Sequence, residues 1–248
     1  KSNKMLNLNL ILNGLVSSLD HAIQGDTLTD PFHMSDDGKS LRQFDYEVCN
    51  PPFNLDFSET RETLAAMPSR FWAGIPNVPK KKKESMSIYT CFLQHVLNSM
   101  KPNGKAAIVL PTGFLTAKSK LLKHIVNERL VYGVISMPSN VFANTGTNVS
   151  VVFFDNSKSS DKVILIDASK LGEEYQEGNN KKVRLTPDEI DMIVDTFLNK
   201  KTVEDFSVAV SYEDIEAKKC SLAAGQYFDV KIEYVELTQE EFENKMSE

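Results

Sequence analysis

The segment "VCNPPF", residues 48–53, ends an apolar run with an amide, two prolines and an aromatic ring. An Asn-Pro pair often marks a turn, and proline cannot continue a central strand, so a plain turn is one explanation. The alternative is a site that holds a planar exocyclic amine while a methyl group is delivered to its nitrogen. We favour the site, because one short segment combines a side-chain acceptor, a rigid backbone and a flat ring.

The exocyclic amine of a purine is a poor nucleophile, because its lone pair is delocalised into the ring. Two acceptors that hold both N–H groups favour a pyramidal nitrogen whose lone pair can point at a methyl donor. We expect the side-chain carbonyl of Asn50 and the backbone carbonyl of Pro51 to be these acceptors. Pro52 stiffens the loop, and Phe53 offers a stacking surface for a base taken out of a duplex.

The elements around this tetrapeptide predict an α/β fold. "FDYEVCN" is predicted as a strand, so the tetrapeptide follows its carboxyl end, where open α/β sheets place their ligands. Helices are predicted over residues 89–100 and 119–127, and a turn at "KPNG" ends the first. Four further strands are predicted at "KAAIVLP", "LVYGVISMP", "NVSVVFFDN" and "KVILIDA". This alternation is typical of βαβ units and a mostly parallel sheet.

The flanking regions are less regular. Residues 1–15 fit either an alternating strand or a helix, and we favour the helix. "HAIQG" is predicted as a short strand that leads into a turn, and residues 54–84 as a long irregular loop of the kind that is functional or mobile. After residue 168, two capping boxes, Thr186 with Glu189 and Thr238 with Glu241, indicate helices. We therefore predict a catalytic domain at 1–168 and a helical extension outside the sheet at 169–248.

Composition narrows the classes of function. The net charge of −6 excludes nucleic-acid binding by the chain as a whole, so a local basic patch or a partner subunit would be needed. Such a patch is present at Lys80, Lys81, Lys82 and Lys83, which either contact phosphates or form a solvated loop. Three widely spaced cysteines favour a reducing cytoplasm, and the four histidines show no metal-binding spacing.

An ordered set of segments now identifies a family. "NLNLILNG", "GDTL", "FDYEVCNPPF", "FLQHVLNSMKPNGKAAIVLPTGFL", "VISMPSNVF" and "SLAAGQYFDV" resemble the methylation subunit of type I restriction–modification systems, an adenine-specific DNA methyltransferase that uses S-adenosylmethionine. The resemblance implies a Rossmann-like methyltransferase sheet whose last strand, here "NVSVVFFD", inserts antiparallel. It also implies two protein partners, a specificity subunit that reads the DNA sequence and a cleavage subunit.

The resemblance implies roles for individual residues as well. Asn50, Pro51 and Phe53 would hold the target adenine, and Pro52 would be structural. Asp26 would accept a hydrogen bond from the adenine amine of the methyl donor, with Leu28 packed nearby. The alternative for Asp26 is a turn aspartate that caps its own loop.

One family feature has no match in the sequence. The glycine-rich turn that cradles the methionine part of the donor is absent, so we expect this turn and the first strand to lie upstream of Lys1. Residues 1–248 alone would then bind the donor poorly, and "FDYEVCN" would present an open apolar edge. Two other functions stay open: an RNA or protein amide methyltransferase, because the same tetrapeptide can hold a guanine amine or a glutamine amide, and a truncated subunit that only bridges partners.

Overall fold

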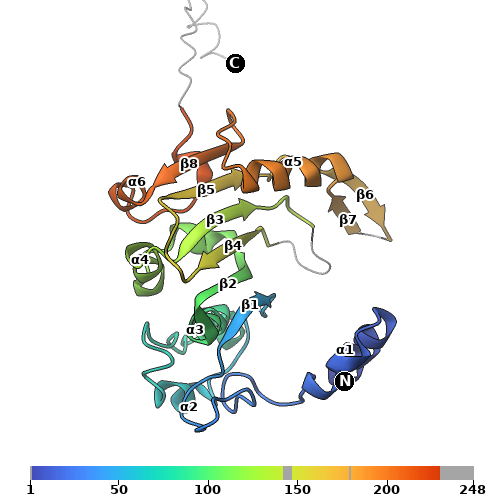
Figure 1. Ribbon diagram of the computed structural model, residues 1–248, viewed down its shortest axis with the longest axis vertical. Helices are drawn as coiled ribbons and strands as arrows, with labels where there is room; N and C mark the ends of the chain where they lie inside the picture. Colours follow the sequence, from blue (N-terminus) through green and yellow to red (C-terminus); the bar gives the residue numbers. More distant parts are fainter. Residues whose placement is uncertain (1, 142–146, 179, 230–248) are drawn as a thin grey trace, which may run out of the picture.

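The centre of the computed structural model is a six-stranded sheet (Figure 1). The structure describes residues 2–141, 147–178 and 180–229. In spatial order the strands are β1 (Phe44–Cys49), β2 (Met100–Pro111), β4 (Val149–Asp155), β3 (Val131–Ser136), β5 (Lys162–Asp167) and β8 (Ser207–Ser211). The pairs β1–β2 and β3–β5 are parallel, and the other pairs are antiparallel. The predicted α/β methyltransferase sheet is therefore confirmed, but it is less parallel than expected, because β4 and β8 run against the other four strands.

Strand β4 lies antiparallel between β2 and β3, as the resemblance implied. Val152 of β4 is opposite Ile108 of β2 on one side and Val134 of β3 on the other. Strand β4 is not the last strand, however, because β5 and β8 continue the same sheet. A smaller correction concerns "KPNG": strand β2 already begins at Met100, so this predicted turn lies within the strand.

Helices cover the two faces of the sheet and build two cores. Helices α3 (Tyr89–Ser99), α4 (Lys120–Asn127) and α6 (Tyr212–Ala217) pack on one face, where they form the largest hydrophobic cluster. Helix α5 (Pro187–Leu198) packs on the other face against Ile164 and Ile166. Alternate residues of a strand face opposite sides, so β5 contributes Val163 and Leu165 to the largest cluster and the two isoleucines to the cluster beneath α5.

The region after residue 168 corrects one prediction. Strands β6 (Glu173–Glu177) and β7 (Asn180–Arg184) form a separate hairpin, and β8 pairs with β5, so this region is not a purely helical extension outside the sheet. The alternating valines of β8 are the physical reason, because they complete the sheet edge beside β5. The capping box of Thr186 and Glu189 is present at the start of α5. Thr238 and Glu241 lie outside the described residues, and the division at residues 168 and 169 stays a prediction.

Between Ser2 and Gln43, the described residues before β1, no strand forms. Helix α1 (Ser2–Leu12) and the 3-10 helix η1 (Val16–His21) precede an irregular segment, so the predicted strand at "HAIQG" is wrong. A short strand is stabilised mainly by its neighbours, and no strand lies beside this segment. The long loop 54–84 contains only the short helices α2 (Arg61–Ala65) and η2 (Lys83–Ser85). Two further 3-10 turns are η3 (Thr112–Thr116) and η4 (Ala224–Gln226).

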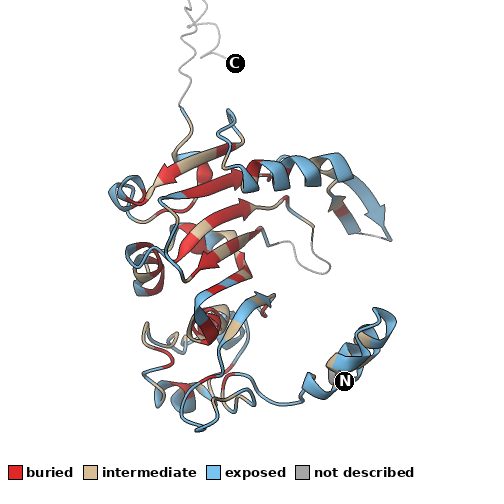
Figure 2. Ribbon diagram, viewed as in Figure 1, coloured by how far each residue is buried: buried red, intermediate tan, exposed pale blue. Residues whose placement is uncertain are grey.

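Strand β1 forms one edge of the described sheet, and its residues are exposed or half-buried (Figure 2). The side chains of Tyr46 and Val48 are 77% and 89% exposed. Among the described strands, β1 is therefore an edge strand, and one of its faces carries exposed apolar side chains. Among the described residues, the helices are too short or too polar for any of them to cross a bilayer.

Candidate active site

The tetrapeptide follows directly after strand β1. Cys49, the last residue of the strand, is paired in parallel with Ile108 of β2, so Asn50 stands at the carboxyl edge of the sheet. Asn50 is exposed, Pro51 is buried and the ring of Phe53 is half-buried. The buried proline anchors the loop beneath an asparagine that an incoming group can reach.

A cavity of about 460 Å³ lies between the Asp26 turn and the chain that follows the tetrapeptide. Asp26, Leu28 and Pro52 line it, so the structure brings together three of the residues predicted from the sequence. We call it the Asp26–Pro52 cavity. Its apolar wall comes from Leu55, Phe57, Leu64, Ile88 and Phe92. Asn50, Pro51 and Phe53 do not line this cavity.

Asp26 caps its own turn, as the alternative explanation required. Its Oδ1 accepts hydrogen bonds from the backbone N–H groups of Leu28 at 2.9 Å and Thr29 at 3.1 Å. Burial raises the pKa of Asp26, but these two N–H groups and the more distant Arg70 outweigh it, so the net pKa lies below the usual range. Capping therefore keeps an ionised carboxylate at the rim of the Asp26–Pro52 cavity.

Leu28 anchors the same turn from below. Its side chain is only 4% exposed and packs in a small hydrophobic cluster of its own, separate from the main core. The other buried members of this cluster are Phe57, Leu64, Phe71, Met86, Ile88 and Cys91. This second cluster joins the Asp26 turn, the long loop and α3, so it forms the floor of the site.

Arg70 was not identified from the sequence, although it contacts the site. Its guanidinium donates to the carbonyl oxygens of Leu28 at 2.7 Å and Thr27 at 2.6 Å, and its Nη2 lies 2.7 Å from Nδ1 of His95. Burial, followed by the nearby Arg70 charge, lowers the pKa of His95 to about 4. His95 is therefore neutral near pH 7 and can accept from Arg70. A lone arginine in a polar loop has no periodic or motif signal by which it could have been found.

Two amides of α3 order the long loop. Gln94, which is fully buried, accepts from the N–H of Ala73 at 2.8 Å and donates to the carbonyl of Gly74 at 3.0 Å. Asn98, one helical turn further on, donates to the carbonyl of Arg70 at 2.9 Å. Two amides four residues apart, on the same side of this amphipathic helix, are the sequence signal for this role.

The last lysine of the basic run lies near the segment that follows the tetrapeptide. The N–H of Leu55 donates to the carbonyl of Met86 at 3.1 Å, which closes the long loop on itself. Lys80, Lys81, Lys82 and Lys83 are all exposed just before this closure. Asp56 has a lowered pKa, first because Ser58 donates to it and also because Lys83 is nearby. The basic run therefore borders the segment that follows Phe53.

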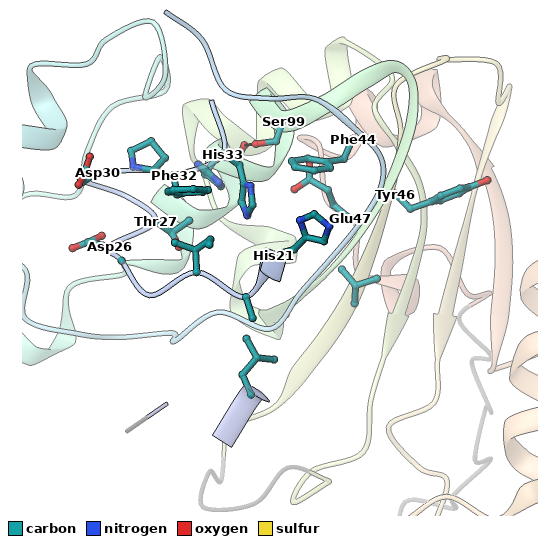
Figure 3. A pocket seen from close by; sticks show the side chains of 17 residues that line it. His21, Asp26, Thr27, Asp30, Phe32, His33, Phe44, Tyr46, Glu47 and Ser99 are labelled. Atoms are coloured by element: carbon teal, nitrogen blue, oxygen red, sulfur yellow. Dashed lines mark hydrogen bonds between the residues drawn. The ribbon is translucent and has the colours of Figure 1, made fainter. Parts of the chain in front are cut away.

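A second cavity, of about 430 Å³, lies beside the β1 edge (Figure 3). His21, His33 and Glu47 lie around it, together with Asp26. One oxygen of Glu47, Oε1, is buried without a hydrogen-bond partner among the described residues, and burial raises the pKa of this carboxyl to about 7. Within residues 2–141, 147–178 and 180–229 no group of three or more ligand side chains could hold a metal ion.

Comparison with known proteins places the chain in a family. The family described as N-6 DNA methylase matches residues 1–234, and the chain belongs to this family. It is 28% identical over 238 residues to the Type I restriction enzyme MpnII methylase subunit of Mycoplasma pneumoniae, and 29% identical over 245 residues to the MjaIX methylase subunit of Methanocaldococcus jannaschii. Both alignments cover 93% of this chain but only 42% and 41% of the relatives, so the chain spans less than half of their length.

Among solved structures, the chain is similar to the methyltransferase subunit of a type I restriction–modification system from Streptococcus thermophilus. The TM-score is 0.70 at 24% identity, over 90% of this chain and 45% of that one. This likeness supports the fold alone. The resemblance to type I methylation subunits stated from the sequence is thus confirmed by the family match and the curated relatives.

The buried Glu47 gives a pH dependence that can be measured. Its pKa is about 7 in the folded chain against 4.5 ordinarily, so the folded state favours the protonated form and loses stability as pH rises towards and through 7. Glu47→Gln cannot ionise. We expect the variant to raise the urea midpoint relative to wild type at pH 8, and the gain to vanish towards pH 4.5. Glu84→Gln, at an exposed position, is the control. An equal gain at both pH values would show that ionisation of Glu47 is not the cause.

Proposed function

We propose that this protein transfers a methyl group from S-adenosylmethionine to the N6 amine of adenine in DNA, as the modification subunit of a type I restriction–modification system. The observation that carries the proposal is the tetrapeptide 50–53 at the carboxyl end of β1, beside the cavity that Asp26, Leu28 and Pro52 line. The family match and the names of the curated relatives support it.

The roles follow from the chemistry of the amine. Asn50 and the Pro51 carbonyl would accept from the two N–H groups of the target adenine. These bonds strengthen as the nitrogen gains positive charge, so they favour the transition state over the ground state. The exposure of Asn50 suits a base that arrives from outside, and the half-buried ring of Phe53 is fixed well enough to stack on it.

The Asp26–Pro52 cavity has the size and chemistry for the adenosine part of the donor. Its volume of about 460 Å³ falls in the range of small-molecule sites, and it combines an apolar wall with carboxyl groups from Asp26, Asp56 and Glu59. Asp26 would accept from the adenine amine, while Leu28 and Phe92 pack against the ring. When bound, S-adenosylmethionine supplies an electrophilic methyl group.

The DNA and protein partners belong to the same proposal. The basic run 80–83 would contact phosphates next to the extruded base, since it borders the segment after Phe53. The net charge of −6 leaves most of the DNA contact to a specificity subunit, with a cleavage subunit as a further partner. Three free cysteines, Cys49, Cys91 and Cys220, favour a location in the cytoplasm.

Asn50→Ala should abolish methyl transfer and leave the fold intact, because it removes one acceptor at the amine and the residue is exposed. Asn50→Asp should be milder, because a carboxylate oxygen still accepts. Transfer of labelled methyl groups into adenine of DNA, with circular dichroism for the fold, measures both. Label that appears in RNA or in protein instead would support the alternative amide or RNA substrates, and near-normal labelling by the alanine variant would exclude the assigned role.

Phe53→Ala should weaken capture of the base more than binding of the donor. Stacking on an aromatic ring is worth roughly 1–3 kcal/mol per base, which corresponds to about a ten- to hundred-fold loss. Phe53→Tyr should restore most of it and serves as the matched control. A fluorescent base analogue at the target position reports extrusion, and equal brightening in wild type and Phe53→Ala would rule out stacking.

Replacement of Lys80, Lys81 and Lys83 by Gln should weaken DNA binding regardless of sequence. Each lost phosphate contact should reduce the slope of log K against log salt by about 0.9. The matched control replaces three exposed lysines elsewhere, Lys158, Lys170 and Lys181. The salt dependence of binding to duplex DNA measures the effect in the protein assembled with its partners. An unchanged slope in the loop variant would identify the run as a solvated loop.

A further inference from the structure

The Asp26 turn has little regular structure to hold it. The segment before it forms no strand, and both Asp26 and Thr27 are exposed. A residue that must present a carboxylate to a ligand nevertheless needs a fixed backbone. Two contacts supply the fixation: the buried side chain of Leu28, and the guanidinium of Arg70 that holds the carbonyls of Thr27 and Leu28 from the long loop.

Arg70 is an unusual residue for a purely structural task. Arg70 is only 8% exposed. Among the described residues, its guanidinium forms no ion pair within 4 Å. Burial of a cation without a contacting carboxylate is costly, and an apolar side chain would fill the same space without that cost. The planar fork of arginine explains the choice, because it spans two successive carbonyls and still reaches His95.

A continuous series of hydrogen bonds connects Arg70 in the long loop with the carboxylate of Asp26. Arg70 fixes the carbonyls of Thr27 and Leu28, and the peptide units of this turn carry the N–H groups of Leu28 and Thr29 that hold Oδ1 of Asp26. The other end of the guanidinium is fixed by His95 on α3.

We propose that Arg70 is a positioning residue for recognition of the donor's purine amine: it fixes the turn that aims Asp26 into the Asp26–Pro52 cavity. This inference rests on the proposed function, in which Asp26 accepts a hydrogen bond from that amine. Arg70 itself touches neither the donor nor the target base. Its loss therefore removes the selectivity that Asp26 provides and spares the apolar contacts of the cavity.

The test compares two nucleosides that differ only in the amine. Adenosine and purine riboside, which lacks the 6-amine, compete with labelled S-adenosylmethionine for the full-length protein, and their affinity ratio isolates the contribution of the amine. A hydrogen bond to a charged acceptor predicts a wild-type ratio of roughly ten- to hundred-fold. Arg70→Lys keeps the charge but not the fork, and we expect its ratio to fall most of the way to one. Asp26→Asn should do the same, because its Oδ1 stays on the N–H groups of Leu28 and Thr29 and its NH2 group meets the amine as a second donor.

Arg61→Lys is the matched control. Arg61 lies in the same loop and also donates to a backbone carbonyl, that of Pro76 at 2.9 Å, but its other hydrogen bonds go to Glu62 and Asn77 rather than to the Asp26 turn. Its ratio should stay at the wild-type value. If Arg70→Lys fails to fold, His95→Leu removes only the acceptor of Nη2, and the ratio should fall part of the way.

The outcomes distinguish a failure of the role proposed for Arg70 from a failure of the role proposed for Asp26. A collapsed ratio in Arg70→Lys with an unchanged ratio in Arg61→Lys supports the positioning role, which a loss of stability alone would not produce. A collapsed ratio in Asp26→Asn with normal ratios in Arg70→Lys and His95→Leu overturns the role of Arg70 and keeps that of Asp26. A wild-type ratio of one shows that Asp26 does not recognise the amine, and both assignments fall together.

Discussion

Helix α3 packs in three directions at once, and the candidate site depends on it. Because successive residues of an α-helix point about 100° apart, neighbouring residues can serve different surroundings. Leu93 faces the main core, and Cys91 faces the second cluster beneath the Asp26 turn. Gln94, His95 and Asn98 hold the long loop and Arg70. The sheet, the long loop and the Asp26 turn therefore take their relative positions from one helix, and the Asp26–Pro52 cavity lies where these parts meet.

Strand β1 connects this arrangement to the tetrapeptide. Its pairing with β2 places Asn50 at the carboxyl end of the parallel strands. The other side of β1 has no neighbouring strand among the described residues. The open edge has an electrostatic consequence. Glu47 is half-buried beside the cavity at this edge, and its Oε1 has no hydrogen-bond partner among the described residues, so its protonation state responds to its surroundings near neutral pH. Whatever covers this edge would change the environment of a carboxyl only three residues before Asn50.

The sequence predicted the elements and motifs that a short stretch of residues is enough to specify. Helix α3 and the inner strands have strong periodicity, and the tetrapeptide and the Asp26 turn stand out through the family pattern. Two errors had a common cause, because a strand depends on its neighbours more than on its own residues. "HAIQG" has strand-like residues without a neighbour, whereas β8 is short and follows a helix but finds an open edge at β5. Arg70 could not be found for a similar reason: its partners are 42 and 43 residues away in sequence, and only the folded chain brings them together.

The two walls of the proposed site are held by different means, and the difference suits what each would bind. On the target side, Pro51 and Pro52 restrict the backbone covalently, so the proposed acceptors at Asn50 and Pro51 would keep their geometry before a base arrived. A base extracted from a duplex has already cost unstacking energy, and it could not also pay to order its own site. On the donor side, hydrogen bonds from Arg70 and the packing of Leu28 hold the turn. A small molecule that must enter and leave in every cycle tolerates, and benefits from, a wall that is fixed by contacts that can loosen and re-form.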